Sequence, residues 1–315
     1  MFHKATWVAA AVVAAFSLAG CEDVVDQRPP VTPPAKPEPP KPTAPVQSQA
    51  SRDVARHYAR VQADLLGRGL LRQDGGGPDV PFSDRQLVEN FVRIALYDEY
   101  VTRGGTLVAQ QSASSLRRWE QPIRVGLRFG DTVPPEQRAK DRAAVSSYVR
   151  RLARITGHPI SMASGNGNFT VLVLNEDERQ VIGPELRRLV PGIDSAATNT
   201  IENLPRDTLC LVFATTTGRS SVYTRSVAVI RGEHPDLLRL SCIHEEMAQG
   251  LGLANDSPAA RPSVFNDDEE FGLLTTHDEL LLRILYDDRL RPGMTEAEAR
   301  PIVRHIVDEI MGGRA

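Results

Sequence analysis

The sequence predicts an α+β protein, with a mixed sheet and packed helices preceded by a helical region and a disordered proline-rich tether. Three observations support this class. Nine of the chain's 23 prolines fall within residues 22–50. Apolar side chains then recur at helical spacing in residues 54–65 and 87–95. Four apolar or alternating runs predict strands, at residues 123–129, 169–174, 208–214 and 222–230.

The first 20 residues have the pattern of a secretory signal. Lys4 supplies the positive start, and an apolar stretch over residues 7–18 leads into small residues. This stretch of about 12 residues is too short for a membrane-spanning helix, which needs roughly 20. Leu18-Ala19-Gly20-Cys21 resembles the lipobox of bacterial lipoproteins, which implies cleavage before Cys21 and acylation of that residue.

From this segment we expect a lipid-anchored protein of the bacterial cell envelope that faces the periplasm. Its lipid contacts the membrane, and the sequence does not distinguish the inner from the outer one. An ordinary signal peptide with an incidental Cys21 is the alternative interpretation.

Residues 21–50 form the lipidated cysteine and a proline-rich linker. They hold too few large apolar side chains to bury a core, so extended polyproline II is favoured. At about 3.1 Å per residue, the linker could hold the folded part on the order of 60 to 90 Å from the bilayer. We interpret it as a passive spacer, because nothing beyond its composition indicates a ligand motif.

Residues 51–315 have the composition of a soluble globular protein. The whole chain is 41% hydrophobic with a net charge of −3, and its seven histidines do not cluster. No basic stripe or basic-aromatic patch occurs, which argues against nucleic acid as a partner. We divide this part into a helical N-terminal region at residues 51–118 and a second domain at residues 119–315.

The N-terminal region contains two helical patterns. Val54, Tyr58 and Leu65 share one helical face, and Ser83 with Gln86 forms a capping box before the second pattern. We therefore expect a pair of helices ahead of the sheet.

Strands and helices alternate after residue 119. The strand at residues 123–129 precedes a helix that Gly157 ends. The strand at residues 169–174 precedes a helix that Asn175 caps and that Gly183-Pro184 breaks or kinks.

The last third of the chain begins with a predicted hairpin. Thr217-Gly218-Arg219 joins the strands at residues 208–214 and 222–230. A helix from Asp236 follows. Two more helices end the chain, near residues 278–286 and 295–311.

The cysteines predict one disulfide. With Cys21 lipidated, Cys210 and Cys242 are an even pair in an oxidising compartment. A bond between them would fasten the predicted strand at residues 208–214 to the helix that begins at Asp236. Two free buried thiols are the alternative.

The helix from Asp236 carries Glu-Glu-x-x-Gln, which has the spacing of the His-Glu-x-x-His motif of zinc proteases. Glu245 and Gln249 stand at the two ligand positions, and Glu246 stands at the general-base position. Gly252 stands at the turn that follows in the extended motif, and Asn255 stands at the third ligand position. The spacing is that of a metal site, but every imidazole is absent.

The donors that are present favour a different ion from zinc. Glu245 offers a carboxylate, whereas Gln249 and Asn255 offer neutral amide oxygens. If a metal binds, such a set suits calcium, magnesium or manganese. Further candidates for the site are Asp256, Asp267 and His277. A purely structural role for Glu245 and Glu246 is the alternative, and the acidic run at residues 266–270 has the same two interpretations, a cation site or a solvated loop.

These residues, together with Leu-Gly-Leu-Ala-Asn-Asp, Ser263-Val-Phe-Asn-Asp267 and the run at residues 276–294, resemble the bacterial domain-of-unknown-function family 2927. The resemblance covers roughly residues 65–311. It implies a zincin-like fold in an exported protein, with no activity that can be transferred to this chain. Two functions follow as hypotheses: a non-catalytic lipoprotein that binds or scaffolds an extended peptide or an envelope protein, and a divergent metal-dependent hydrolase of envelope peptides with Glu246 as general base.

Overall fold

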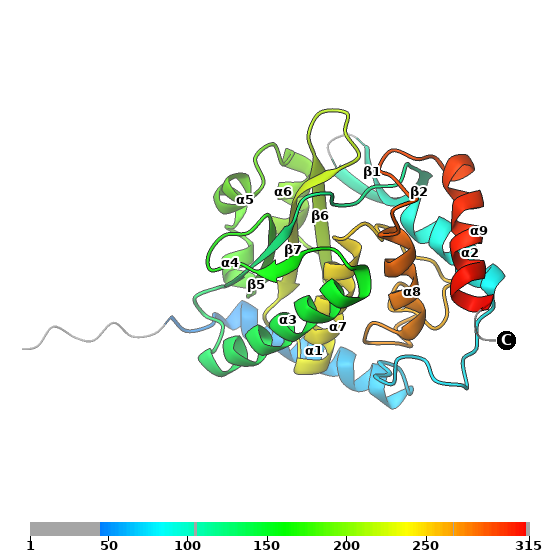
Figure 1. The fold of residues 1–315 in the computed structure, drawn as a ribbon. Coiled ribbons are helices and arrows are strands. Elements are labelled where there is room, and N and C mark those ends of the chain that lie inside the picture. The colour runs from blue at the N-terminus through cyan, green and yellow to red at the C-terminus, as the bar shows by residue number, and fades with distance from the viewer. Residues whose placement is uncertain (1–44, 104–105, 267, 313–315) are drawn as a thin grey trace, which may run out of the picture. The chain divides into compact units, whose positions relative to one another are not determined.

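A five-stranded mixed sheet organises the folded part of the chain (Figure 1). The computed structural model describes residues 45–103, 106–266 and 268–312. The strand order is β4-β3-β5-β7-β6; β3, β4, β5 and β7 are parallel, and β6 is antiparallel to β7 at one edge. The strands are β3 (Ile123–Phe129), β4 (Ile160–Met162), β5 (Phe169–Leu174), β6 (Cys210–Thr216) and β7 (Tyr223–Arg231). The expected signal, Cys21 and most of the linker lie outside the described residues.

The central strand β5 explains how two helical layers cover the sheet. All six of its residues are buried, so its apolar run is continuous, as is usual for a strand covered on both faces. Val171 and Val173 pack into one core with α3 (Pro135–Thr156) and α7 (Asp236–Gln249). Leu172 and Leu174 pack into a second core with α5 (Gly183–Leu189) and α6 (Ser195–Glu202).

The structure confirms the α+β class and the mixed sheet, and the four predicted strands form within two residues of their expected bounds. The short strand β4 was not expected. The helix predicted after Asn175 forms as two helices, α4 (Glu176–Arg179) and α5, which begins at Gly183. Gly157 ends α3 with a left-handed backbone, φ 65°, which is the conformation that favours glycine at a helix end.

The N-terminal region is not purely helical. Both predicted helices form, α1 (Gln49–Gly67) and α2 (Asp84–Ala95), and the Ser83 capping box is present. A hairpin follows them, with β1 (Tyr97–Arg103) antiparallel to β2 (Thr106–Ala113). The expectation of a helical region up to residue 118 is therefore wrong after α2. Its signal was two runs rich in Tyr, Val and Thr on either side of a Gly-Gly pair.

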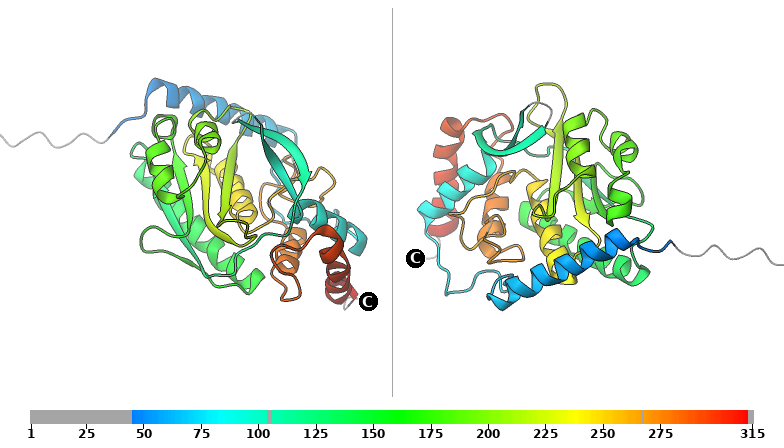
Figure 2. Two further views of the ribbon diagram at one scale, coloured as in Figure 1. Left: turned by 90° about the horizontal axis from the view of Figure 1, so that it is seen from above. Right: turned by 180° about the vertical axis from the view of Figure 1, so that it is seen from behind.

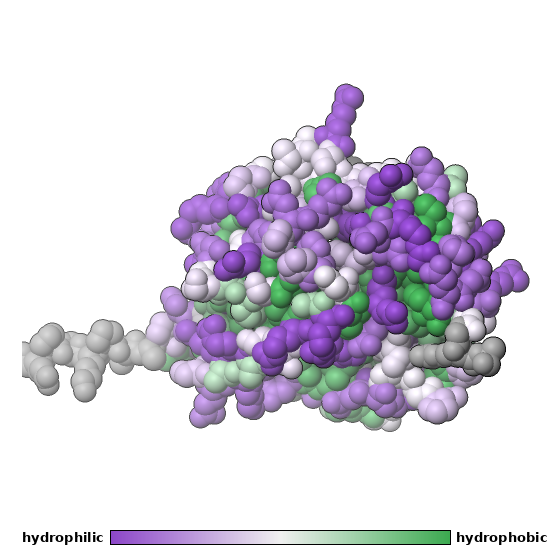
Figure 3. Space-filling view, viewed as in Figure 1, coloured by the Kyte–Doolittle hydropathy of each residue, from purple (hydrophilic) through white to green (hydrophobic). Residues whose placement is uncertain are grey.

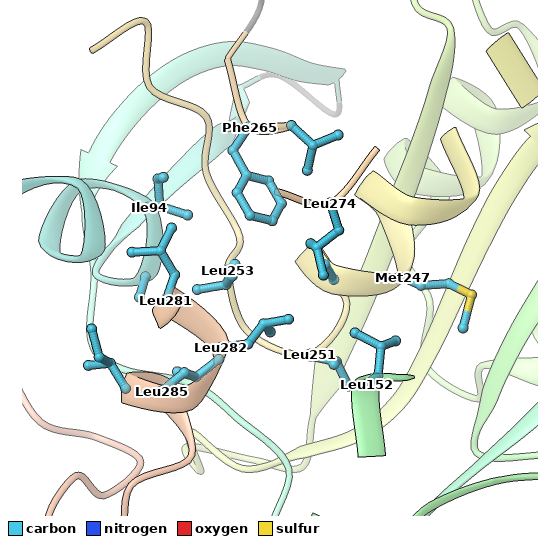
Figure 4. Close-up of a cluster of buried hydrophobic side chains, with 14 of the residues drawn as sticks. Ile94, Leu152, Met247, Leu251, Leu253, Phe265, Leu274, Leu281, Leu282 and Leu285 are labelled. Carbon is cyan, nitrogen blue, oxygen red and sulfur yellow. The ribbon is translucent and has the colours of Figure 1, made fainter. Parts of the chain in front are cut away.

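One large core also joins the two parts that the sequence suggested as separate domains. The compact unit runs from Ala44 to Ala315. Ile94 of α2, Leu251 and Leu253 after α7, and Leu281 and Leu285 of α8 all belong to this core (Figure 4). The last two helices, α8 (Thr276–Leu285) and α9 (Glu296–Gly312), pack against α2 in this core.

The helix α1 lies across one side of the unit and supports the start of α7 (Figure 2). Val54 and Tyr58 pack with Leu238 of α7. Gln62 accepts a hydrogen bond from the Leu238 N–H at 2.9 Å, which satisfies one of the N–H groups that a helix start leaves unpaired. The first helix therefore helps to hold the motif helix in place.

Hydrophilic and apolar residues are interspersed on the face shown in Figure 3. Within the described ranges, no helix combines the length and the apolar character that crossing a membrane requires.

A disulfide joins Cys210, the first residue of β6, to Cys242 in α7, with the two Cα atoms 5.9 Å apart. The bond closes a loop with a sequence separation of 32 residues. It therefore ties the edge strand of the sheet directly to the helix that carries Glu245 and Glu246.

The double variant Cys210→Ala/Cys242→Ala is expected to lose about 3 to 4 kcal/mol of unfolding free energy, because the open chain regains the entropy that the closed loop removes. Urea denaturation of the oxidised protein and the variant measures this. Wild type treated with a thiol reductant should lose the same amount. Equal stability of the oxidised protein and the double variant would contradict the prediction.

Candidate functional site

A cleft of about 640 Å³ opens beside β6 and α7. Residues of β6 form one wall, and Glu245, Glu246 and Gln249 of α7 face into it. The start of β1, the segment after α7, and α6 with the chain that follows it contribute other lining residues. This volume is within the range of about 300 to 1,000 Å³ that is usual for ligand pockets.

The helix α7 divides its side chains between the core and the cleft. Ile243 and Met247 are buried in the main core. Glu245 and Gln249 are four residues apart, so they share a helical face. With Glu246 between them, all three line the cleft, and Glu246 is only 3% exposed. The structure therefore brings together three of the four residues that the motif indicated.

Asn255 does not line the cleft, because its side chain is bound to the end of α2. Its Nδ2 donates to the carbonyl of Arg93 at 2.8 Å, and its backbone N–H donates to the carbonyl of Ile94 at 3.1 Å. These bonds fasten the segment after α7 to the end of α2. The next residue, Asp256, lines the cleft instead, and its Oδ1 accepts a hydrogen bond from Gln249 Nε2 at 3.0 Å. The set Glu245, Gln249 and Asn255 is not assembled around one point.

His244 and His277 both lie in the core. His244 stacks on Tyr148, with ring centroids 4.0 Å apart, and its Nδ1 accepts the N–H of Leu274 at 3.1 Å. Burial lowers the pKa of His244 to about 3, so the ring is neutral near pH 7. His277 is fully buried against Asn90, outside the lining of the cleft. Asp267 lies outside the described residues.

Comparison with known families bears on the segment that holds this site. A family model described as Protein of unknown function (DUF2927) matches residues 84–305. The chain belongs to the DUF2927 family. The match begins at α2 and includes the motif helix, α8 and most of α9. No curated protein matches the chain.

The cleft of this DUF2927 chain is strongly acidic. Among the described residues that line it, seven are Asp or Glu and one is basic, Arg117, which pairs with Asp98. The acidic residues are Asp98, Glu99, Asp207, Glu245, Glu246, Asp256 and Glu269. Asp98, Glu99, Asp207 and Glu269 were not identified as candidates individually, because they are far from the motif in sequence.

The acidic run at residues 266–270 divides between two environments. Glu270 forms ion pairs with Arg72 and Arg261. Glu269 lines the cleft, with a backbone φ of 59° that is uncommon for a residue other than glycine. Glu269 and Glu270 therefore have different surroundings, and the two interpretations of the run stay predictions.

Burial and nearby carboxylates both raise the pKa of the two motif carboxyls, Glu245 and Glu246. Burial raises the pKa of Glu246 well above its ordinary value of 4.5, and the charges of Glu99 and Asp256 raise it further. Burial, then Asp256 and then Glu246, raise the pKa of Glu245 in the same direction. Glu246 Oε2 is buried without a hydrogen-bond partner among the described residues.

The donor set does not fit zinc. In the described chain, the ligand atoms of Cys210, Glu245 and Glu246 lie within 4.8 Å of one another. The Cys210 sulfur is bonded to Cys242 and offers no thiolate. No histidine is among the described residues that line the cleft, so this lining offers neither the nitrogen nor the thiolate ligands of structural and catalytic zinc sites.

Glu246→Gln is expected to stabilise the protein at neutral pH, by the roughly 0.5 to 2 kcal/mol typical of favourable substitutions. The folded-state pKa is raised, so below about pH 4 the carboxyl is protonated in both states and imposes no penalty. As the pH rises above the ordinary carboxyl pKa of 4.5, Glu246 ionises in the unfolded chain but stays protonated in the folded protein, so the folded protein loses stability. The gain in the variant should therefore be absent near pH 4 and grow towards pH 8.

Thermal unfolding of wild type and Glu246→Gln between pH 4 and 8 measures this gain. Glu120→Gln, at an exposed carboxylate, is the control and should leave the melting temperature unchanged throughout. A melting temperature of Glu246→Gln below that of wild type at pH 8 would contradict the assignment.

Gly252 is the turn glycine of the motif, and its φ is 129°. A Cβ added there would lie 2.2 Å from the carbonyl oxygen of Arg117, a backbone atom. Gly252→Ala is therefore expected to lose about 2 kcal/mol or more of stability. Gly165→Ala, where a Cβ meets nothing within 4 Å, is the matched control. Chemical denaturation of both variants tests the prediction, which fails if the two are equally stable.

Proposed function

We propose that this DUF2927 protein binds an extended peptide in the cleft, as a non-catalytic lipoprotein of the bacterial envelope. The single observation that carries the proposal is the position of β6. This strand pairs with β7 on one side and has no strand partner on its other side among the described residues. Residues 210–214 of β6 line the cleft.

A strand edge that borders a cleft supplies the main-chain groups that recognise a peptide. Alternate residues of an edge strand direct their N–H and C=O groups away from the sheet, where an added strand can pair with them. Neighbouring strands lie about 4.8 Å apart, so a peptide paired with β6 occupies the cleft. The seven residues of β6 offer room for a short extended segment.

Side chains of β6 give the two faces of such a peptide different surroundings. Cys210, Val212 and Ala214 pack towards the main core, on the side of α7. Leu211 and Phe213 pack towards the core of α5 and α6. Alternate side chains of the bound peptide would meet α7 on one face and α6 on the other, which provides a basis for specificity.

The zincin-like relationship and the location are parts of the same proposal. The spacing of Glu245, Glu246, Gln249 and Gly252, on a helix packed against a mixed sheet, supports a zincin-like domain whose substrate cleft has become a binding cleft. The signal pattern and Cys21 support acylation and periplasmic exposure. The expected ligand is therefore a peptide or a protein segment of the envelope.

A library of acetylated, amidated random hexapeptides tests the binding function with the full chain in detergent. We expect selected peptides to lose tenfold or more in affinity when alternate residues are N-methylated, because main-chain hydrogen bonds to β6 are removed. Methylation of the intervening residues should be tolerated. The absence of any binding peptide, or equal losses at both sets of positions, would contradict the proposal.

Protein variants locate the binding. Ala214 lines the cleft, so Ala214→Trp should block the selected peptides. Ser164 is exposed in a loop outside the lining of the cleft, and Ser164→Trp is the matched control that should bind normally.

A hydrolase is the second candidate, and the buried carboxylate of Glu246 favours it, because a group with a raised pKa in a cleft can serve as a general base or acid. Elemental analysis of protein purified without chelator, with Glu245→Ala beside it, tests the metal-dependent form. One equivalent of metal that the variant lacks, and peptide cleavage that Glu246→Gln abolishes, would replace the binding proposal with the hydrolase.

A further inference from the structure

The geometry points to a positively charged side chain of the bound peptide, a lysine-like ammonium or an arginine-like guanidinium, as the group that the α7 side of the cleft recognises, with Glu246 as its principal partner. This inference rests on the proposed peptide-binding function and adds the chemical class of the ligand.

The first observation is that a buried carboxylate oxygen of Glu246 has no hydrogen-bond donor among the described residues. Glu246 is 3% exposed, it lines the cleft, and its Oε2 has no hydrogen-bond partner in the described chain. Buried polar atoms in native proteins nearly always have a partner, so such an oxygen indicates a group that arrives from outside. The position on α7 directs that group to the cleft.

The second observation is the charge of the surroundings. Arg117, the one basic residue in the described lining of the cleft, pairs with Asp98 near the start of β1. The Gln249 amide donates its hydrogen bond to Asp256 and not to Glu246. A neutral donor would satisfy only the hydrogen bond at Glu246. An ammonium or guanidinium group supplies several donors to Glu246 and also a positive charge beside these carboxylates.

The third observation is the short distance between the strand edge and these carboxylates. The Sγ atom of Cys210 and carboxylate oxygens of Glu245 and Glu246 lie within 4.8 Å of one another. Cys210 begins β6, and its side chain packs towards the core of α7. A peptide strand beside β6 would pass about 4.8 Å from it. A long side chain on its α7-facing side can therefore reach Glu246 and Glu245.

The disulfide makes this distance a fixed property of the protein. Because it joins β6 to α7, the strand edge and the carboxylates cannot separate without breaking a covalent bond. The same cleft surface therefore offers main-chain pairing and a charged subsite at a set spacing.

Peptides in which one cationic residue is replaced by a neutral one test the inference. In each selected peptide, lysine is replaced by norleucine and arginine by citrulline, which keep the length and remove the charge. On wild type we expect a loss of tenfold or more in affinity from one such replacement. On Glu246→Gln and on Asp256→Asn, the charged and neutral peptides should differ much less. Glu120→Gln, the exposed control, should behave as wild type.

A second measurement separates failure of this inference from failure of the proposed function. Titration calorimetry of the full chain with 1,5-diaminopentane and with agmatine examines the charged subsite without any peptide backbone. Binding that Glu246→Gln weakens tenfold supports the subsite even if no hexapeptide binds. Selected peptides without a cationic residue, with no binding of either amine, would overturn the inference and leave peptide binding intact.

The remaining possible result is that the acidic site binds a metal ion. The same titrations are made with calcium, magnesium and manganese chlorides after treatment with chelator. A divalent ion that binds one to one, depends on Glu246 and displaces the amines would overturn the inference in favour of an oxygen-liganded cation site.

Discussion

The attachment of β6 to α7 is the constraint on which the candidate site depends. An edge strand by itself offers hydrogen-bonding groups, and a helix by itself offers carboxylates. The Cys210–Cys242 bond and the main core hold the two together, so that Glu245 and Glu246 lie beside the first residue of β6. The strand edge that borders the cleft and the two carboxyls of α7 beside it follow from this one arrangement.

That arrangement carries an energetic penalty in the unliganded protein. A carboxyl group is least stable as an anion when it is buried among other acids, which is the environment of Glu246. Arg239 and Asp141, which pair in the interior at 2.9 Å, show the ordinary solution for buried charge. Glu246 Oε2 has no hydrogen-bond partner among the described residues, and a buried carboxyl that reduces stability in this way is a candidate for ligand binding rather than for folding.

Local patterns predicted most of the elements because each element depends on neighbouring residues. The capping box at Ser83 and the glycine at position 157 set helix ends where the sequence indicated. The apolar run of β5 formed a buried strand because helices cover both faces of the sheet. The hairpin of β1 and β2 was missed although its turn residues were visible, since the helical pattern before it was extended too far.

The sequence alone determined which side chains α7 offers: the spacing of Glu245, Glu246 and Gln249 places them along one side of any helix. Only the tertiary structure decided what surrounds them. The turn at Gly252 directs Asn255 to α2 and Asp256 to the cleft, and Glu99 and Glu269 arrive from distant segments. Periodicity describes neighbours along one helix, whereas the direction of a chain after a turn and the approach of remote residues depend on how the whole core packs.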